Sequence, residues 1–162
     1  MKYTSVNELS NFDYHDAELN SIIFQDCCLR WEVSNINATT ANSQNDFGVD
    51  MCIGNATMVF NDVTIEGIVF GAYTSTQNGI ITEYPSVAVK SEEHLDALKS
   101  IIDEDSYIYD LEELVAIDAN RYKARFHIGF NTYLSFIFTE SIISWKEFIG
   151  KAWYEHDKWK KQ

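Results

Sequence analysis

Apolar and polar residues alternate with a period of two along much of the chain, which is the pattern of half-buried strands. In the clearest run, Leu29, Trp31 and Val33 alternate with polar residues, directly after a strand run at 19–24. Further strands are predicted at 49–53, at 57–73 with breaks at Asn61–Asp62 and Gly67, and at 114–117, 122–128 and 132–138. Two segments between such runs are typical of hairpin turns, Asn78-Gly79 and Gly129-Phe130-Asn131.

Helical patterns occur at three places, at the start of the chain, between strands and at its C-terminal end. Ser5 with Glu8, and Ser144 with Glu147, have the spacing of a capping box, in which the two side chains bond backbone N–H groups at a helix start. The third helix is predicted to begin at Ser91 and to have the apolar stripe Leu95, Leu98, Ile101 and Ile102. The helix predicted from Ser144 has Lys158, Lys160 and Lys161 in its last turn and packs on the sheet through Trp145, Phe148, Ile149, Ala152 and Trp153.

Together these elements predict a single α+β domain over residues 1–162, mainly an antiparallel sheet with a C-terminal helix and one internal helix packed on it. A hydrophobic content of 46%, with one proline and seven glycines, is that of an ordinary globular domain. No apolar run reaches the roughly 20 residues that cross a bilayer, and the first residues lack the layout of a secretion signal. We therefore expect a cytoplasmic protein.

The three cysteines match neither a disulfide set nor a metal site. Cys27 and Cys28 are adjacent and Cys52 stands apart, so the odd number leaves no closed set of pairs. The paired spacing of zinc ligands is also missing. We expect reduced thiols buried in the core, and no metal or other cofactor.

Charge says more about possible partners. The chain has 12 basic and 25 acidic residues, a net charge of −13. The acid is densest over 92–118, where Lys99 is the single basic residue, and the residues that we assign to recognition are Glu92, Glu93, Asp96, Asp103, Glu104 and Asp105. Such a surface repels phosphate backbones and anionic lipids, so we expect neither nucleic acid nor a membrane as partner. A basic protein fits the charge, and the alternative is that the acid serves solubility alone.

The densest mixed polar cluster comes just before the first long strand. Asp13, His15 and Asp16 would suit a small metal-dependent hydrolase, because carboxylates and an imidazole bind metals and move protons. The structural alternative, which we favour, has an aspartate accepting backbone donors at a tight turn while His15 bonds a carboxylate or carbonyl. On that interpretation, replacing His15 by alanine lowers the free energy of unfolding by about 1–3 kcal/mol.

A second alternative site is a basic strand face. The residues Arg121, Lys123, Arg125 and His127 alternate along one predicted strand and would suit a small-anion-binding domain. The simpler interpretation is that this face meets carboxylates from 92–118 or water. The sequence has no nucleophile elbow and no glycine-rich phosphate loop, so we assign no catalytic residue.

The segment Tyr14-His15-Asp16-Ala17-Glu18-Leu19, with the alternating strand at 29–33, resembles a group of small bacterial proteins. These begin with an aromatic-His-Asp-small motif followed by a strand pair, and some are assigned as immunity proteins of toxin–immunity systems. The resemblance covers 12–33, with a looser similarity at 58–65, and Tyr14 stands where phenylalanine or tryptophan is common. It implies an α+β antiparallel domain that binds and blocks a toxin, and it carries over no catalytic residue.

We therefore expect a cytosolic protein-binding domain rather than an enzyme, an immunity protein whose acidic surface meets a basic partner. The hydrolase at Asp13, His15 and Asp16 and the small-anion-binding domain remain as alternatives.

Overall fold

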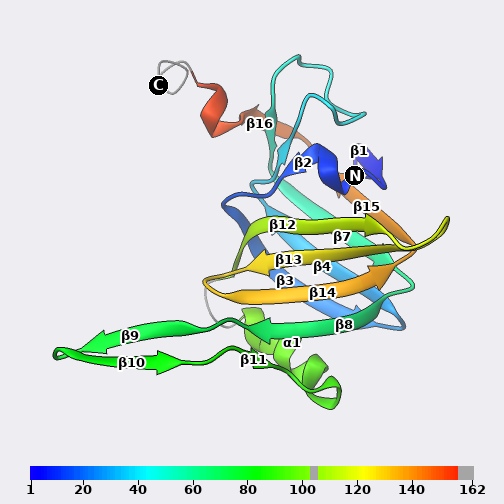
Figure 1. Cartoon of the computed structure of the whole chain (residues 1–162). Coiled ribbons are helices and arrows are strands. Elements are labelled where there is room, and N and C mark those ends of the chain that lie inside the picture. Colours follow the sequence, from blue (N-terminus) through cyan, green and yellow to red (C-terminus); the bar gives the residue numbers. More distant parts are fainter. Residues whose placement is uncertain (103–105, 157–162) are drawn as a thin grey trace.

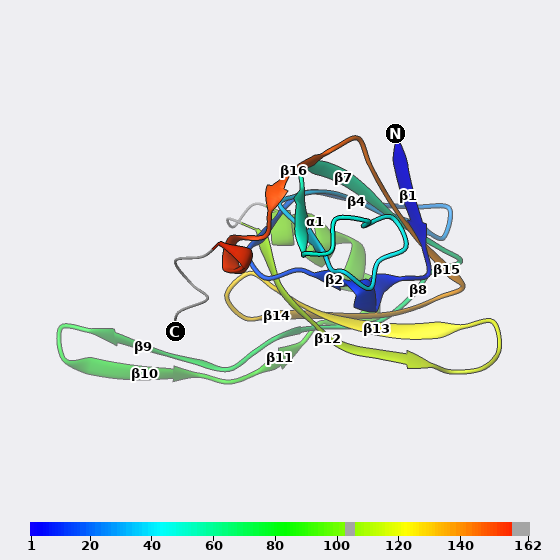
Figure 2. The same cartoon turned by 90° about the horizontal axis from the view of Figure 1, so that it is seen from above.

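The computed structural model describes residues 1–102 and 106–156, in which ten antiparallel strands form one large sheet (Figure 1). Five of them form one layer, in the order β1 (Tyr3–Val6), β15 (Glu140–Trp145), β7 (Asn55–Asn61), β4 (Cys28–Ser34) and β3 (Ala17–Gln25). The other five continue the order as β12 (Tyr107–Ala116), β13 (Tyr122–Ile128), β14 (Thr132–Phe138), β8 (Thr64–Phe70) and β11 (Val87–Ala88). The sheet doubles back between β3 and β12, so that these two halves face each other (Figure 2).

The two layers are joined at a narrow corner. β3 pairs with β12 through Ala17 and Glu18, which lie opposite Ile108 and Tyr107. Beyond this point an extra residue, Asn20, shifts the register between β3 and β4, and β3 continues alongside β4 alone. A bulge of this kind increases strand twist, which turns one layer away from the other.

Aromatic rings fill the space between the layers. The Trp31 ring on β4 lies 4.9 Å from the Phe126 ring on β13, and the Phe60 ring on β7 lies 4.8 Å from the Phe136 ring on β14. All four side chains are fully buried, and the rings meet edge to face, the geometry that aromatic quadrupoles favour. The alternation in the sequence therefore places one face of each layer in a shared core.

A smaller sheet covers one end of the two layers (Figure 1). Its strands, in order, are β16 (Phe148–Lys151), β6 (Met51–Ile53), β5 (Asn37–Ala38) and β2 (Phe12–Asp13). Two single-turn 3-10 helices adjoin it, η1 (Leu9–Asn11) and η3 (Trp153–Glu155).

A helix lies at the opposite end of the layers (Figure 1). The 3-10 turn η2 (Ser91–Glu93) leads into α1 (His94–Ile102), which contacts β3 and β8. This confirms the internal helix, although Ser91 makes no side-chain cap. Its buried face contains His94, Ala97, Leu98 and Ile101, whereas Leu95 of the predicted stripe is exposed. His94 fits this face because its Nε2 lies 3.2 Å from the Val89 carbonyl oxygen.

The Asn78-Gly79 turn joins β9 (Tyr73–Gln77) to β10 (Ile80–Tyr84) in a separate two-stranded ribbon. Asn78 and Gly79 both have positive φ, at 51° and 78°, as a type I′ hairpin turn requires. The ribbon continues outward from β8 and β11 and projects far beyond the body of the protein (Figures 1 and 2).

The prediction of an α+β class with a C-terminal helix is wrong. Over residues 1–102 and 106–156 the protein is 57% strand and 12% helical, a mainly antiparallel β structure in which the segment 91–102 supplies the main helix. None of the helices in the described ranges is long and apolar enough to span a membrane.

Both capping-box segments are strands and turns. Ser5 lies in β1 and its hydroxyl donates to the Glu8 carboxylate, which also accepts a 2.7 Å hydrogen bond from the Ser43 hydroxyl. Ser144 lies in β15, and the chain after it forms β16 and the turn η3. The lysines predicted for the last helical turn, Lys158, Lys160 and Lys161, lie outside the described residues.

Because strands replace the predicted C-terminal helix, Trp145 rather than Trp153 is the tryptophan that the core buries. Trp145 is fully buried between Tyr3, Phe12 and Phe148, whereas Trp153, which the helix would have buried, is 47% exposed.

We expect Trp145→Ala to lower the free energy of unfolding by about 3–5 kcal/mol, because it opens a cavity in a closely packed core. Trp153→Ala is the matched control, and its cost should stay under about 2 kcal/mol because much of the ring is already in water. Urea denaturation of the two variants measures both values. Equal losses would contradict the strand assignment of 140–151.

Candidate functional site

Three of the residues predicted for recognition, Glu92, Glu93 and Asp96, lie at the end of the molecule from which the β9–β10 ribbon projects (Figure 1). Glu92, Glu93 and Asp96 are exposed on η2 and the first turn of α1, on the side away from the buried stripe. Asp103, Glu104 and Asp105, which belonged to the same prediction, lie outside the described residues. The acid on α1 therefore forms part of the same end of the protein as the ribbon.

The ribbon exposes apolar side chains on both of its faces. Ile80 and Ile81 are 69% and 68% exposed, and as neighbours on a strand they point to opposite faces. Tyr73 and Tyr84 stack at the base of the ribbon with ring centroids 4.5 Å apart. Glu83 is the one charged residue between positions 71 and 89, so the ribbon is nearly neutral beside an acidic helix.

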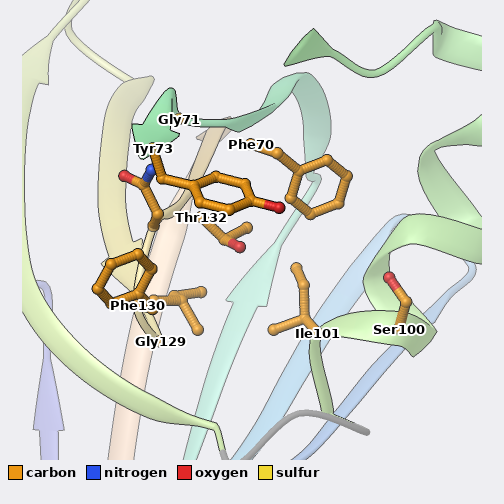
Figure 3. A pocket seen from close by; sticks show the side chains of 10 residues that line it. Phe70, Gly71, Tyr73, Ser100, Ile101, Gly129, Phe130 and Thr132 are labelled. Carbon is orange, nitrogen blue, oxygen red and sulfur yellow. The ribbon is translucent and has the colours of Figure 1, made fainter. Parts of the chain in front are cut away.

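A hollow of about 440 Å³ lies at the root of the ribbon (Figure 3). Three segments far apart in sequence form it: the β8–β9 junction, the last turn of α1 and the β13–β14 turn. Its principal walls are the side chains of Phe70, Tyr73, Ile101, Phe130 and Thr132. This volume lies within the usual range of small-molecule pockets.

The aromatic-His-Asp motif forms the turn that leads into the corner between the layers. Tyr14 is buried, its hydroxyl donates to the Leu9 carbonyl at 2.8 Å, and burial raises its pKa well above the usual value. Its ring packs edge to face on Phe126, and its carbonyl accepts the Ala17 N–H at 2.9 Å. Asp16 adopts a left-handed conformation, with φ of 66°, to complete the turn.

The polar side chains of the motif have separate sets of partners. Asp13 accepts the His15 N–H at 3.2 Å and the side-chain amide of Asn37 at 3.3 Å. His15 Nδ1 lies 2.9 Å from an Asp16 carboxylate oxygen, and both of these side chains are largely exposed. Asp13 thus accepts a backbone donor while His15 contacts a carboxylate. This is the arrangement expected if the motif holds a turn rather than a metal.

His15 and Asp16 border a second, shallower hollow of about 490 Å³ that also contains Cys52 and His156. Burial raises the pKa of the Cys52 thiol, which disfavours the thiolate that a nucleophile or metal ligand needs. Within the ranges 1–102 and 106–156, no group of three or more histidine, cysteine or carboxylate side chains is placed to hold a metal. The cysteines are also less buried than predicted, since Cys27 is exposed and Cys28 and Cys52 are half-buried.

The basic strand face is occupied by acidic and aromatic partners. Arg121 pairs with Asp118 at 2.8 Å, Lys123 with Glu66 at 3.0 Å, and Arg125 with Glu112 at 3.3 Å. The His127 ring is stacked between Tyr109 and Tyr133, with centroid distances of 4.9 and 4.6 Å. An anion on this face would have to compete with these carboxylates, which favours the interpretation of the face as internally paired.

Sequence reasoning found the acidic residues of α1 but missed the hollow beside them. A local signal existed for the ribbon, because Asn78-Gly79 predicted the hairpin and Ile80-Ile81 follows the turn directly. The hollow had no such signal, since its walls come from positions 70–73, 100–101 and 128–132.

Comparison with known proteins found no matching family model, no matching curated protein and no matching solved structure. The function of the chain must therefore be inferred from its own residues.

The motif geometry yields a matched pair of variants. Asp13→Ala should lower the free energy of unfolding by about 1–3 kcal/mol, because it removes the acceptor of the buried Asn37 amide. His15→Ala should cost less than about 1 kcal/mol, smaller than its sequence suggested, because the pair that it breaks is exposed. Denaturation curves of the two variants measure both losses in the free energy of unfolding. A larger loss in His15→Ala than in Asp13→Ala would assign the structural role to the imidazole.

Proposed function

We propose that this chain is a non-enzymatic protein-binding domain that neutralises a basic toxin domain, as immunity proteins do. The observation that carries the proposal is the β9–β10 ribbon, which presents exposed isoleucines beyond the body of the protein (Figures 1 and 2). Exposed apolar surface with polar surroundings is a mark of protein interaction sites. An isolated two-stranded ribbon is at best marginally stable, so a partner that covers it adds to its order.

The charge supports a partner of basic character. The chain carries a net charge of −13, and Glu92, Glu93 and Asp96 are exposed on η2 and α1, beside the strands from which the ribbon departs. Complementary charge speeds the encounter of two proteins, while the apolar contact that follows holds the complex together. The acid and the ribbon would then have separate parts in one interface.

The resemblance at 12–33 suggests a toxin-blocking function, but the α+β class that it implied is wrong, so the interface is argued from other residues. Tyr14 and Ala17 are buried where the two layers join, so the motif shapes the fold and leaves the choice of partner to the exposed ribbon and helix. The exposed residues of the motif, His15 and Asp16, pair with each other.

The test begins with the product of the gene adjacent to the one that encodes this chain. The proposal expects that product to inhibit growth when expressed alone and to be neutralised and co-purified when this chain is present. The double variant Ile80→Ser/Ile81→Ser should bind it at least tenfold more weakly with an unchanged thermal midpoint, because both side chains are already in water. An adjacent product that neither inhibits growth nor binds this chain contradicts the proposal.

A matched control is available in Ile23→Ser/Ile117→Ser, since both isoleucines are exposed and lie outside the ribbon. This variant should bind and protect like the wild type. If it loses as much affinity as the ribbon variant, the ribbon is not the interface.

The acidic residues should act mainly on the rate of association. Reversing the charge at Glu92, Glu93 and Asp96 to lysine should slow association with the basic partner by about tenfold or more at low salt. The difference should shrink above about 0.15 M salt, where the screening length is about 8 Å. Stopped-flow or surface-binding kinetics measure this, and an unchanged association rate at low salt would assign these carboxylates to solubility.

A further inference from the structure

The hollow at the root of the ribbon has a wall of three aromatic rings, which lie around an open space (Figure 3). Phe70, Tyr73 and Phe130 come from β8, β9 and the β13–β14 turn. Phe130 is 80% exposed, and neither phenylalanine has a ring partner among the described side chains. Exposed aromatic rings around one space can be covered by a ligand or by a side chain of another protein.

Hydrogen bonds and close packing join the start of the ribbon to the β13–β14 turn beside the hollow. The Asn131 side-chain amide donates to the Ala72 carbonyl at 2.9 Å, and the Gly71 N–H donates to the Asn131 carbonyl at 2.8 Å. Asn131 packs so closely on Gly71 that a Cβ on this glycine would lie 2.3 Å from its Oδ1. The start of the ribbon is therefore held against the β13–β14 turn, and the Tyr73 ring is fixed by its stacking on Tyr84.

The electrostatic surroundings favour a cation. No lining residue is charged, and aromatic ring faces attract cations through their quadrupole. Ser100 and Ile101 belong to the last turn of α1, where the helix dipole is negative. Asp96 lies one helical turn before Ser100 on the same face, so exposed acid leads along the helix toward the hollow. Lys99 is the basic residue of this turn, but it lies about 100° around the helix from Ser100 and does not line the hollow.

We propose that this hollow receives an arginine side chain of the partner protein, stacked on the aromatic wall. Arginine fits better than lysine, because its planar guanidinium stacks on rings and is more weakly hydrated. This inference rests on the proposed function for the source of the arginine, while the chemistry of the hollow can be tested without the partner.

The probe is N-acetyl-arginine amide, titrated into the full chain and followed by NMR. Signals of Ile101, Phe130 and Thr132 should shift in a saturable way. N-acetyl-citrulline amide has nearly the same shape without the charge and should bind at least about threefold more weakly, as expected for a cation–π contact. Equal shifts with citrulline, or no shifts with arginine, would overturn the inference.

Two variants locate the binding. Phe130→Ala should weaken arginine binding by about threefold or more, and because the ring is exposed its removal should leave the fold intact. Phe47→Ala is the matched control, an exposed phenylalanine outside the hollow, and should bind like the wild type. Equal weakening in both variants would place the probe elsewhere on the protein.

The failure of this inference and that of the proposed function can be told apart. If the partner binds and Phe130→Ala captures it as well as the wild type, the arginine assignment fails and the protein-binding function stands. If the arginine probe binds while the adjacent gene product does not, the hollow stands and the proposed function fails.

Discussion

The narrow corner at which Ala17 and Glu18 pair with Ile108 and Tyr107 is the constraint on which the rest of the structure depends. It lets one sheet cover itself, so that rings from both halves share a single core. The turn that enters this corner is held by Tyr14, whose hydroxyl is bonded and whose ring touches the opposite layer. Both ends of the molecule, the small sheet and α1, are positioned by how the two halves close on each other (Figure 2).

The long strands with period-two alternation, such as β3, β4, β13 and β14, and the two hairpin turns could be predicted from local sequence. Period-two alternation decides which residues face the core, and Asn78-Gly79 favours a turn that few other pairs adopt. The failures occurred where local and long-range preferences compete. Ser144 to Glu147 has the spacing of a helix start, but Trp145 gains more by packing against Phe12 and Tyr3, which are more than 130 positions away. Burial of a tryptophan outweighs a cap worth about 1 kcal/mol.

The same limit applies to the candidate site. The exposure of Glu92, Glu93 and Asp96 followed from the apolar stripe opposite them, which occupies the inner face of a single helix. The aromatic hollow required the β13–β14 turn to meet the end of β8, and that contact depends on the pairing of β14 with β8. Strand order is a property of the whole chain, so no window of sequence contains it.

The projecting ribbon exposes the protein to edge-to-edge aggregation, and the negative charge of the chain opposes this. Both of its outer edges carry unpaired backbone donors and acceptors, and its faces expose isoleucine, which is the kind of surface through which sheets aggregate edge to edge. Two copies of this chain approach each other with −13 on each, and that repulsion opposes such pairing. Because the repulsion is screened by salt whereas strand pairing is not, colloidal stability of the isolated protein depends on ionic strength. The same charge therefore opposes pairing between two ribbons least at high ionic strength.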